Sequence, residues 1–175
     1  MNTIFYRAGI ELYWLAICLA APFQTKARAF IRGRRNWQQR LKQQKEEGSY
    51  AWFHCASMGE FEQGRPVIEA FRHAYPEMKI ALSFFSPSGY ENAKHDGLAE
   101  IVFYLPKDNP KNAEKLIEIL KPKLAVFVKY EYWYYLLKQL KDHKTKTLLI
   151  SAHFRKDQIF FKPWGRFFFF FIFFF

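Results

Sequence analysis

The amino-acid sequence predicts an α/β fold with a Rossmann-like parallel sheet. Short apolar runs alternate along the chain with segments of about ten residues that have helical periodicity. Strands that alternate with helices in this way form right-handed βαβ units, with parallel strands side by side and helices on both faces. The chain has 175 residues, which is long enough for one domain of this kind.

Five segments are expected to form the strands. Each is a short run rich in aliphatic or aromatic residues and is followed by small, turn-forming or charged residues, which is typical of buried strands. The first run opens the stretch WFHCASMGEFEQGRPVIEAFR, in which a small-residue turn and an amphipathic segment come next. The expected strands are 51–55, 79–85, 101–105, 124–128 and 147–150.

Helices are expected after these strands. In the first of them Pro66 is placed near the start, because proline is tolerated in the first helical turn. Glu60 would then lie in the turn between strand and helix. The other expected helices are a short polar one that ends at Ala93, one over 111–120, and one that carries Trp133, Leu136, Leu137 and Leu140.

An apolar segment over 4–23 comes before the domain and contains Arg7 and Glu11. Its uninterrupted part, 12–23, is shorter than the roughly 20 residues that span a bilayer. A signal peptide is disfavoured by the basic stretch that follows. We expect a membrane anchor or an in-plane helix over 1–23, and a core helix of the domain is the alternative.

The basic stretch lies within 24–48. Positive charge beside a membrane segment marks its cytoplasmic side and is attracted to anionic headgroups. A solvated basic helix face and an RNA-binding segment are alternatives. No recognition module with aromatic strand residues follows the stretch, so a nucleic-acid partner is not expected. Its basic residues include Lys26, Arg28, Arg32, Arg34, Arg35, Arg40, Lys42 and Lys45.

Composition limits the partners. The formal net charge is +11 and the pI is near 9.6, which favours anionic partners: nucleic acid, phosphorylated lipid or an acidic membrane surface. Cys18 and Cys55 lie far apart and form neither a metal-ligand pair nor a disulfide framework, so a reducing cytoplasm fits.

The last nine residues, 167–175, read FFFFFIFFF. They have no helical or strand periodicity, and they are too few to cross a bilayer. The composition changes abruptly here, so we expect a truncated or frame-shifted reading frame.

Polar residues after four predicted strands form the candidate site. Ligands of parallel α/β sheets bind outside the carboxyl ends of the strands, so these residues are expected to converge on one edge. Each has a structural alternative: a turn serine, a carboxylate that favours a helix N-terminus by its charge, a packed loop histidine or a surface arginine. The candidates are Ser57, Gly59, Glu60, Ser86, Ser88, Gly89, Glu131, His153 and Arg155.

Glu60 and Glu131 are the central pair of this set. A like charge nearby raises the pKa of a carboxyl group, which would suit one of the two to act as a base near neutral pH. His54 lies within the first predicted strand and is interpreted as structural.

Five segments of the chain resemble motifs of the Kdo transferases. These glycosyltransferases add 3-deoxy-D-manno-octulosonic acid (Kdo) to the lipid A precursor at the inner membrane. The resemblance covers nearly everything from the N-terminus to Gly165, and the motifs occur in the family's order with matching spacing. They are GRRNWQQRL at 33–41, HCASMGE at 54–60, SPSG at 86–89, YEYW at 130–133 and SAHFR at 151–155.

The sequence departs from the family motifs at several positions. Lys129 stands where the first Glu of the family's E-[ST]-E-[LI]-W-P motif is usual, and Tyr134 replaces its Pro. His153 stands where the family's N-A-R-[LIM]-S motif has Arg. Glu60 and Glu131 match their motifs.

The resemblance implies the N-terminal, acceptor-side domain of a GT-B glycosyltransferase, preceded by a membrane-associated helix. Glu60 would be the catalytic base, and Glu131 and the other candidates would bind or support the acceptor. The donor CMP-Kdo would be held by a C-terminal domain that this sequence lacks. The reaction would invert the anomeric centre and need no cofactor or metal.

The expected organisation follows. Residues 1–23 form the membrane anchor or in-plane helix, 24–48 a basic linker or helix, 49–166 the Rossmann-like acceptor-binding domain, and 167–175 the anomalous tail. The expected partners are the lipid A precursor and an anionic membrane surface, at the cytoplasmic face of the bacterial inner membrane. The alternative function is a non-catalytic Rossmann-like module that binds an anionic lipid or a phosphorylated ligand.

Overall fold

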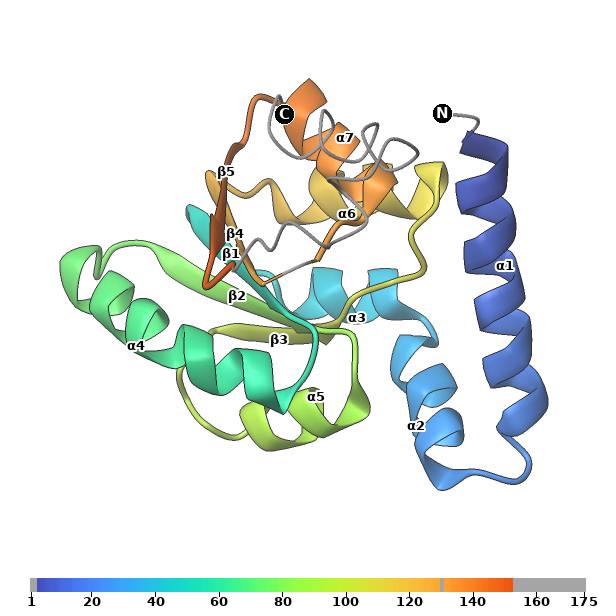
Figure 1. The fold of residues 1–175 in the computed structure, drawn as a ribbon. Helices are drawn as coiled ribbons and strands as arrows, with labels where there is room; N and C mark the ends of the chain where they lie inside the picture. The colour runs from blue at the N-terminus through green and yellow to red at the C-terminus, as the bar shows by residue number, and fades with distance from the viewer. Residues whose placement is uncertain (1–2, 130, 153–175) are drawn as a thin grey trace.

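A computed structural model describes residues 3–129 and 131–152 (Figure 1). All five strands run parallel, in the order β3-β2-β1-β4-β5. This order matches the first five strands of the doubly wound dinucleotide-binding sheet. The α/β prediction is confirmed, and each predicted strand is found with its ends within one residue of the observed bounds. The strands are β1 (Tyr50–Cys55), β2 (Lys79–Phe84), β3 (Ile101–Tyr104), β4 (Leu124–Val128) and β5 (Lys146–Ile150).

Helices cover both faces of the sheet (Figure 1). Alternate residues of each inner strand point to opposite faces, and β1 is buried on both, as expected for a parallel sheet. One core cluster joins the sheet to α3, α6 and α7, and the other joins it to α4 and α5. The helices are α1 (Thr3–Ala20), α2 (Thr25–Arg34), α3 (Trp37–Gln44), α4 (Met58–Ala74), α5 (Pro87–Ala93), α6 (Pro110–Leu120) and α7 (Tyr134–Asp142).

The predicted start of α4 is wrong. The helix begins at Met58, so Pro66 lies in its interior and Glu60 lies in its first turn rather than in the turn before it. Proline removes one intrahelical hydrogen bond. Packing outweighs this loss, because Phe61 is fully buried and Gly64 lets the helix approach β4 closely.

Helix α1 stands beside the domain, next to α2 (Figure 1). None of its residues is buried, and one face is held against the domain by side-chain contacts. The opposite face and the turn after the helix expose Ile4, Phe5, Leu12, Leu15, Leu19 and Phe23. The domain contacts are Tyr6 with Asp108 (2.6 Å), Glu11 with Lys107, and Tyr13 with the Phe85 ring.

Within the described residues, α1 is the one helix whose length and composition would allow it to cross a membrane. A signal sequence or a core helix can meet the same criterion, so membrane association stays a prediction. The domain boundaries drawn from the sequence also stay predictions, and the poly-Phe segment lies outside the described residues.

Asp108 fastens α1 to α7. Its carboxylate is 5 % exposed and accepts hydrogen bonds from the Tyr6 hydroxyl and from the backbone N–H groups of Tyr135 and Leu136. Burial is the main reason that the pKa of Asp108 is raised.

We expect Asp108→Ala to lower the free energy of unfolding by about 2–4 kcal/mol, because it leaves buried donors without an acceptor. Asp108→Asn keeps one of the two acceptor oxygens in a side chain of the same shape and should cost less. Urea unfolding of the two variants checks this, and equal losses for both would contradict it.

Candidate active site

The strand order reverses between β1 and β4. After β1 the chain adds β2 and then β3 on one side of β1. It then returns to add β4 and β5 on the other side of β1. Ligands of open α/β sheets bind in the crevice at this switch point, outside the carboxyl ends of the strands. Ser57 and Glu60 follow β1 here, and Lys129 and Glu131 follow β4.

Glu60 is held by two neighbours, and 19 % of its side chain is exposed. Ser57 donates its hydroxyl hydrogen to Oε2 of Glu60, and Nζ of Lys129 lies 3.4 Å from Oε1. Burial acts to raise the pKa of Glu60. The hydrogen bonds from Ser57 and from the backbone, together with the Lys129 charge, outweigh it, so the pKa lies below its ordinary value. Glu60 is therefore a carboxylate at neutral pH.

The expectation of a raised pKa is thus wrong for Glu60. The charge in contact with it is the Lys129 ammonium, and an opposite charge favours the ionised carboxylate. The sequence argument considered only the like charge of Glu131.

The spacing of Ser57 and Glu60 is that of a helix capping box, in which the serine oxygen accepts a backbone hydrogen bond. Ser57 makes no such side-chain cap bond and donates to Glu60 instead. Glu60 also accepts from its own backbone N–H, so the helix N-terminus contributes to its ionisation. Ser57 is therefore the N-cap residue of α4 and also positions the Glu60 carboxylate.

Lys129 has a left-handed backbone, with φ of 66°. The Cβ atom makes this region costly, by about 1 kcal/mol or more, and such residues cluster at functional sites. The Lys129 N–H donates to the carbonyl of Ile150, at 2.9 Å, which ties this bend to the end of β5. The bend turns the chain after β4 so that Lys129 reaches Glu60.

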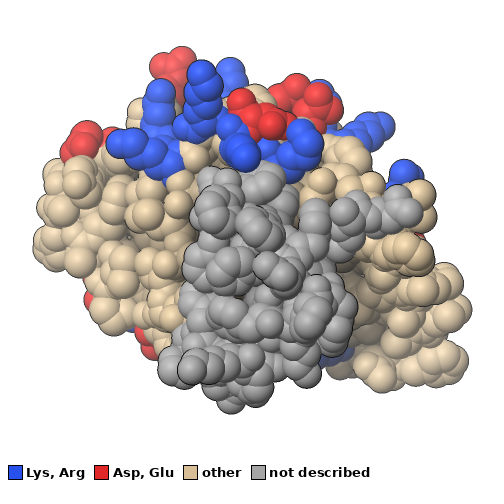
Figure 2. Space-filling model, turned by 45° about the horizontal axis from the view of Figure 1, so that its top comes forward, with Lys and Arg blue, Asp and Glu red and all other residues tan. Residues whose placement is uncertain are grey.

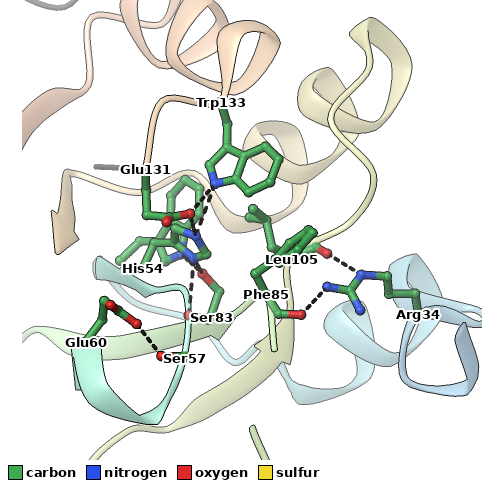
Figure 3. A network of polar contacts seen from close by, with 10 residues as sticks. Arg34, His54, Ser57, Glu60, Ser83, Phe85, Leu105, Glu131 and Trp133 are labelled. Carbon is green, nitrogen blue, oxygen red and sulfur yellow. Dashed lines mark hydrogen bonds and ion pairs between the residues drawn. The ribbon is translucent and has the colours of Figure 1, made fainter. Parts of the chain in front are cut away.

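Glu131 belongs to a second polar cluster (Figure 3). Its Oε2 lies 3.1 Å from His54 Nε2 and accepts a hydrogen bond of 2.8 Å from Trp133 Nε1. His54 is fully buried in β1, and its Nδ1 lies 2.8 Å from the Ser83 hydroxyl of β2. The cluster thus joins the ends of three adjacent strands, β2, β1 and β4.

One arrangement of protons gives Trp52, Ser83, His54 and Glu131 a consistent chain of hydrogen bonds. Trp52 Nε1 can only donate, and it donates to Ser83 Oγ at 2.8 Å. The Ser83 hydroxyl hydrogen is then free to point at His54 Nδ1, which leaves the histidine hydrogen on Nε2, directed at Glu131. Glu131 then receives hydrogen bonds from the buried His54 and from the partly buried Trp133, which fix its position.

Both carboxylates lie near the end of β1. Burial raises the pKa of the Cys55 thiol, and the charges of Glu60 and then Glu131 raise it further. Glu60 and Glu131 therefore lie at the same edge of the sheet, with Glu60 held by a cation and a hydroxyl and Glu131 beside the ring nitrogens of His54 and Trp133.

The loop after β2 adjoins this edge. The Ser86 N–H donates to the Ala56 carbonyl at 2.7 Å, and its hydroxyl lies 3.0 Å from that of the exposed Ser88. Gly89 is buried for a packing reason, because a Cβ there would come 2.3 Å from the Phe84 ring. Gly59 has room for a side chain. His153 and Arg155 lie outside the described residues.

Sequence reasoning missed three members of the site. His54 was interpreted as structural, although it opens the HCASMGE segment and contacts Glu131. Trp133 is predicted only as a helix residue and a motif match, and Lys129 only as a departure from a motif, whereas the structure places both beside a carboxylate. The signal available in the sequence was that all three residues lie within or next to the motif segments. Among residues 3–129 and 131–152, no group of His, Cys, Asp and Glu could hold a metal ion.

Comparison with known proteins identifies the family. Residues 35–173 match the family model of 3-deoxy-D-manno-octulosonic-acid transferase (kdotransferase). The chain belongs to this family. The match includes all five strands and both carboxylates.

Individual relatives agree with this. The chain is 30% identical over 142 residues to a bifunctional glycosyltransferase/methyltransferase of Fusobacterium nucleatum, covering 79% of this chain and 22% of that protein. It is 30% identical over 128 residues to a 3-deoxy-D-manno-octulosonic acid transferase of Chlamydia trachomatis serovar D, covering 70% of this chain and 30% of that one. A protein of the same description from Aquifex aeolicus is 34% identical over 83 residues, or 47% and 23% of the two chains. The chain thus spans between about a fifth and a third of the length of these relatives.

We expect Lys129→Met to raise the pKa of Glu60, because the neighbouring positive charge is lost. Lys123→Met removes a lysine from the opposite edge of the sheet, next to Tyr50, and should leave the pKa unchanged. Titration of the labelled Glu60 carboxylate by NMR measures both. A Glu60 pKa that Lys129→Met leaves unmoved would show that the ion pair does not form in solution.

Proposed function

We propose that this chain is the acceptor-side part of a GT-B glycosyltransferase that transfers Kdo from CMP-Kdo to a lipid A precursor with inversion. The observation that carries the proposal is the ionised Glu60 beside Lys129 at the switch point of the sheet. Family membership and the names of the Kdo transferases that the chain resembles support the reaction class.

In the proposed reaction Glu60 acts as general base. A hydroxyl of the acceptor sugar approaches the carboxylate and gives up its proton to it as the oxygen attacks the anomeric carbon of Kdo. The new C–O bond forms on the face opposite the leaving CMP, whose bond to that carbon breaks, so the configuration inverts. A base with a lowered pKa is already deprotonated at neutral pH, but it is weak. Proton transfer is therefore expected to accompany bond formation rather than precede it.

The remaining polar residues are proposed to hold the acceptor. Glu131, fixed by His54 and Trp133, would shape the pocket beside Glu60. Acceptor-side roles are also proposed for Ser57, Gly59, Ser86, Ser88, Gly89, His153 and Arg155. CMP-Kdo would be bound by a C-terminal domain, and the greater length of the relatives supports this part of the proposal.

Membrane association at the cytoplasmic face of the bacterial inner membrane is part of the proposal. The apolar face of α1 points away from the domain, where burial in the interfacial region of a bilayer would remove it from water. Lys and Arg side chains also gather along one edge of the molecular surface, with acidic side chains among them (Figure 2). Because Tyr6 and Tyr13 contact the domain, we propose that the helix lies in the membrane plane.

A non-catalytic module that binds an anionic lipid is the second candidate. The net charge of +11 favours it, and so does the Lys129–Glu60 ion pair, which partly neutralises the proposed base. Such a module would bind lipid whatever residue stands at position 60.

We expect Glu60→Gln to lower Kdo transfer by about 10²–10⁴-fold, because the isosteric amide cannot accept the proton. The assay follows labelled Kdo from CMP-Kdo to a lipid A precursor, using the chain extended through the downstream reading frame. Glu62→Gln, on the exposed side of α4, is the matched control and should keep full activity. Equal transfer by the Glu60→Gln variant would exclude the base, and absence of transfer from the extended parent would favour the binding module.

Replacing Leu12, Leu15 and Leu19 by Ser should weaken binding to vesicles of phosphatidylglycerol and phosphatidylethanolamine more than about tenfold. The matched control replaces three exposed apolar residues elsewhere, Val67, Tyr75 and Leu148, by Ser. Vesicle co-sedimentation gives both affinities. If the two triple variants lose binding equally, α1 is not the membrane-binding element.

A further inference from the structure

Arg34 is a buried cation far from the two carboxylates. It lies at the end of α2, is 7 % exposed, and forms no ion pair with any carboxylate in the described part of the chain. Burial lowers the pKa of Arg34 to about 9, which still leaves the guanidinium charged at neutral pH. A buried charge is costly unless its donors are satisfied, so the surroundings of Arg34 are expected to be specific.

Backbone carbonyls satisfy the guanidinium. Nη2 donates to the Phe85 carbonyl at 2.7 Å, and Nε donates to the Leu105 carbonyl at 2.8 Å (Figure 3). Phe85 directly follows β2 and Leu105 directly follows β3. Nη1 donates to the Phe30 carbonyl in the same helix, at 3.0 Å. Arg34 therefore joins α2 to the carboxyl ends of two strands.

Aromatic rings enclose the same group. The guanidinium carbon lies 3.5 Å from the centroid of the Phe30 ring and about 5 Å from those of Phe85 and Tyr104, consistent with cation–π attraction. Gly33 makes this approach possible, because a Cβ there would come 2.3 Å from the Tyr104 ring. Position 33 therefore requires a glycine for steric reasons, and Arg34 is stabilised electrostatically by the rings around it.

Phe85 carries the connection onward to the site. Its ring packs on that of Trp133, with centroids 4.9 Å apart and an interplanar angle of 35°. The Trp133 indole N–H in turn donates to Glu131 and also lies 3.2 Å from His54 Nε2. The orientation of the Trp133 ring therefore decides where this donor points, and Phe85 supports one side of that ring.

We propose that Arg34 is a positioning residue of the candidate active site: through the carbonyl and ring of Phe85 it holds Trp133 in the orientation that fixes Glu131. The effect on transfer rests on the proposed function, whereas the effect on Trp133 does not. Arg34 touches neither carboxylate and is not a catalytic residue.

The first test uses the indole N–H signals of the five tryptophans in the 175-residue chain, with Trp133→Phe assigning the relevant one. Arg34→Lys keeps the charge but cannot donate to two separate carbonyls in the same fork. It should shift the Trp133 signal. Arg72→Lys changes an arginine that bonds Leu98 and Glu100 instead, and it should leave that signal in place.

Phe85→Leu is the second variant and keeps the test valid if Arg34→Lys does not fold. It removes the ring but retains the carbonyl that Arg34 bonds, and should shift the Trp133 signal too. Phe85→Tyr restores a ring and should return the signal close to its original position. A folded Arg34→Lys or Phe85→Leu variant whose Trp133 signal stays unmoved overturns the proposal.

The second test measures transfer by the extended chain. Arg34→Lys and Phe85→Leu should each lower kcat about tenfold, with a smaller change in KM, as expected when a group is misplaced rather than lost. Ile80→Ala, a buried change at the opposite end of β2, controls for reduced stability and should leave kcat unchanged. An equal fall in kcat for Ile80→Ala would reduce Arg34 to a structural role. Shifted Trp133 signals with no transfer by the parent would instead overturn only the proposed function.

Discussion

The parallel pairing of β1 with β4 is the constraint on which the site depends. It places Ala51 to His54 beside Leu124 to Phe127, residue against residue, although about seventy positions separate them in the chain. Because the strands run in the same direction, the segments that leave them emerge at one edge. Glu60 and Glu131 lie at the same edge for this reason. Each would otherwise be one acidic residue near the start of a helix.

The two carboxylates are held by opposite physical means. Glu60 is partly exposed and has a hydroxyl and an ammonium as neighbours, so its ionised form is favoured and still within reach of solvent. Glu131 receives its hydrogen bonds from the buried ring of His54 and the partly buried ring of Trp133. A group that exchanges protons needs access, whereas a group that defines shape needs rigidity. The arrangement at the sheet edge suits the proposed roles of Glu60 as base and of Glu131 as a residue that shapes the pocket.

Side-chain contacts tie the N-terminal helices α1 and α2 to the sheet and its flanking helices. α1 contributes Tyr6 to the buried carboxylate of Asp108, and α2 contributes Arg34 to the ends of β2 and β3. Tyr13 of α1 and Arg34 both contact Phe85, which in turn supports Trp133. Packing contacts therefore run from α1, whose outer face exposes apolar side chains, to the polar edge of the sheet.

Strand positions, the α/β class and the convergence of Glu60 with Glu131 could all be predicted from the sequence, because hydrophobic periodicity is local and the parallel topology follows from it. The beginning of α4 could not be predicted. Pro66 reads as a helix start by local preference, and the burial of Phe61 against the sheet overrides that preference. The partners of each charged group also required tertiary structure. Whether a carboxylate meets a lysine or an indole depends on side chains brought together across strands, and Coulomb and hydrogen-bond energies fall steeply with distances that no linear pattern contains.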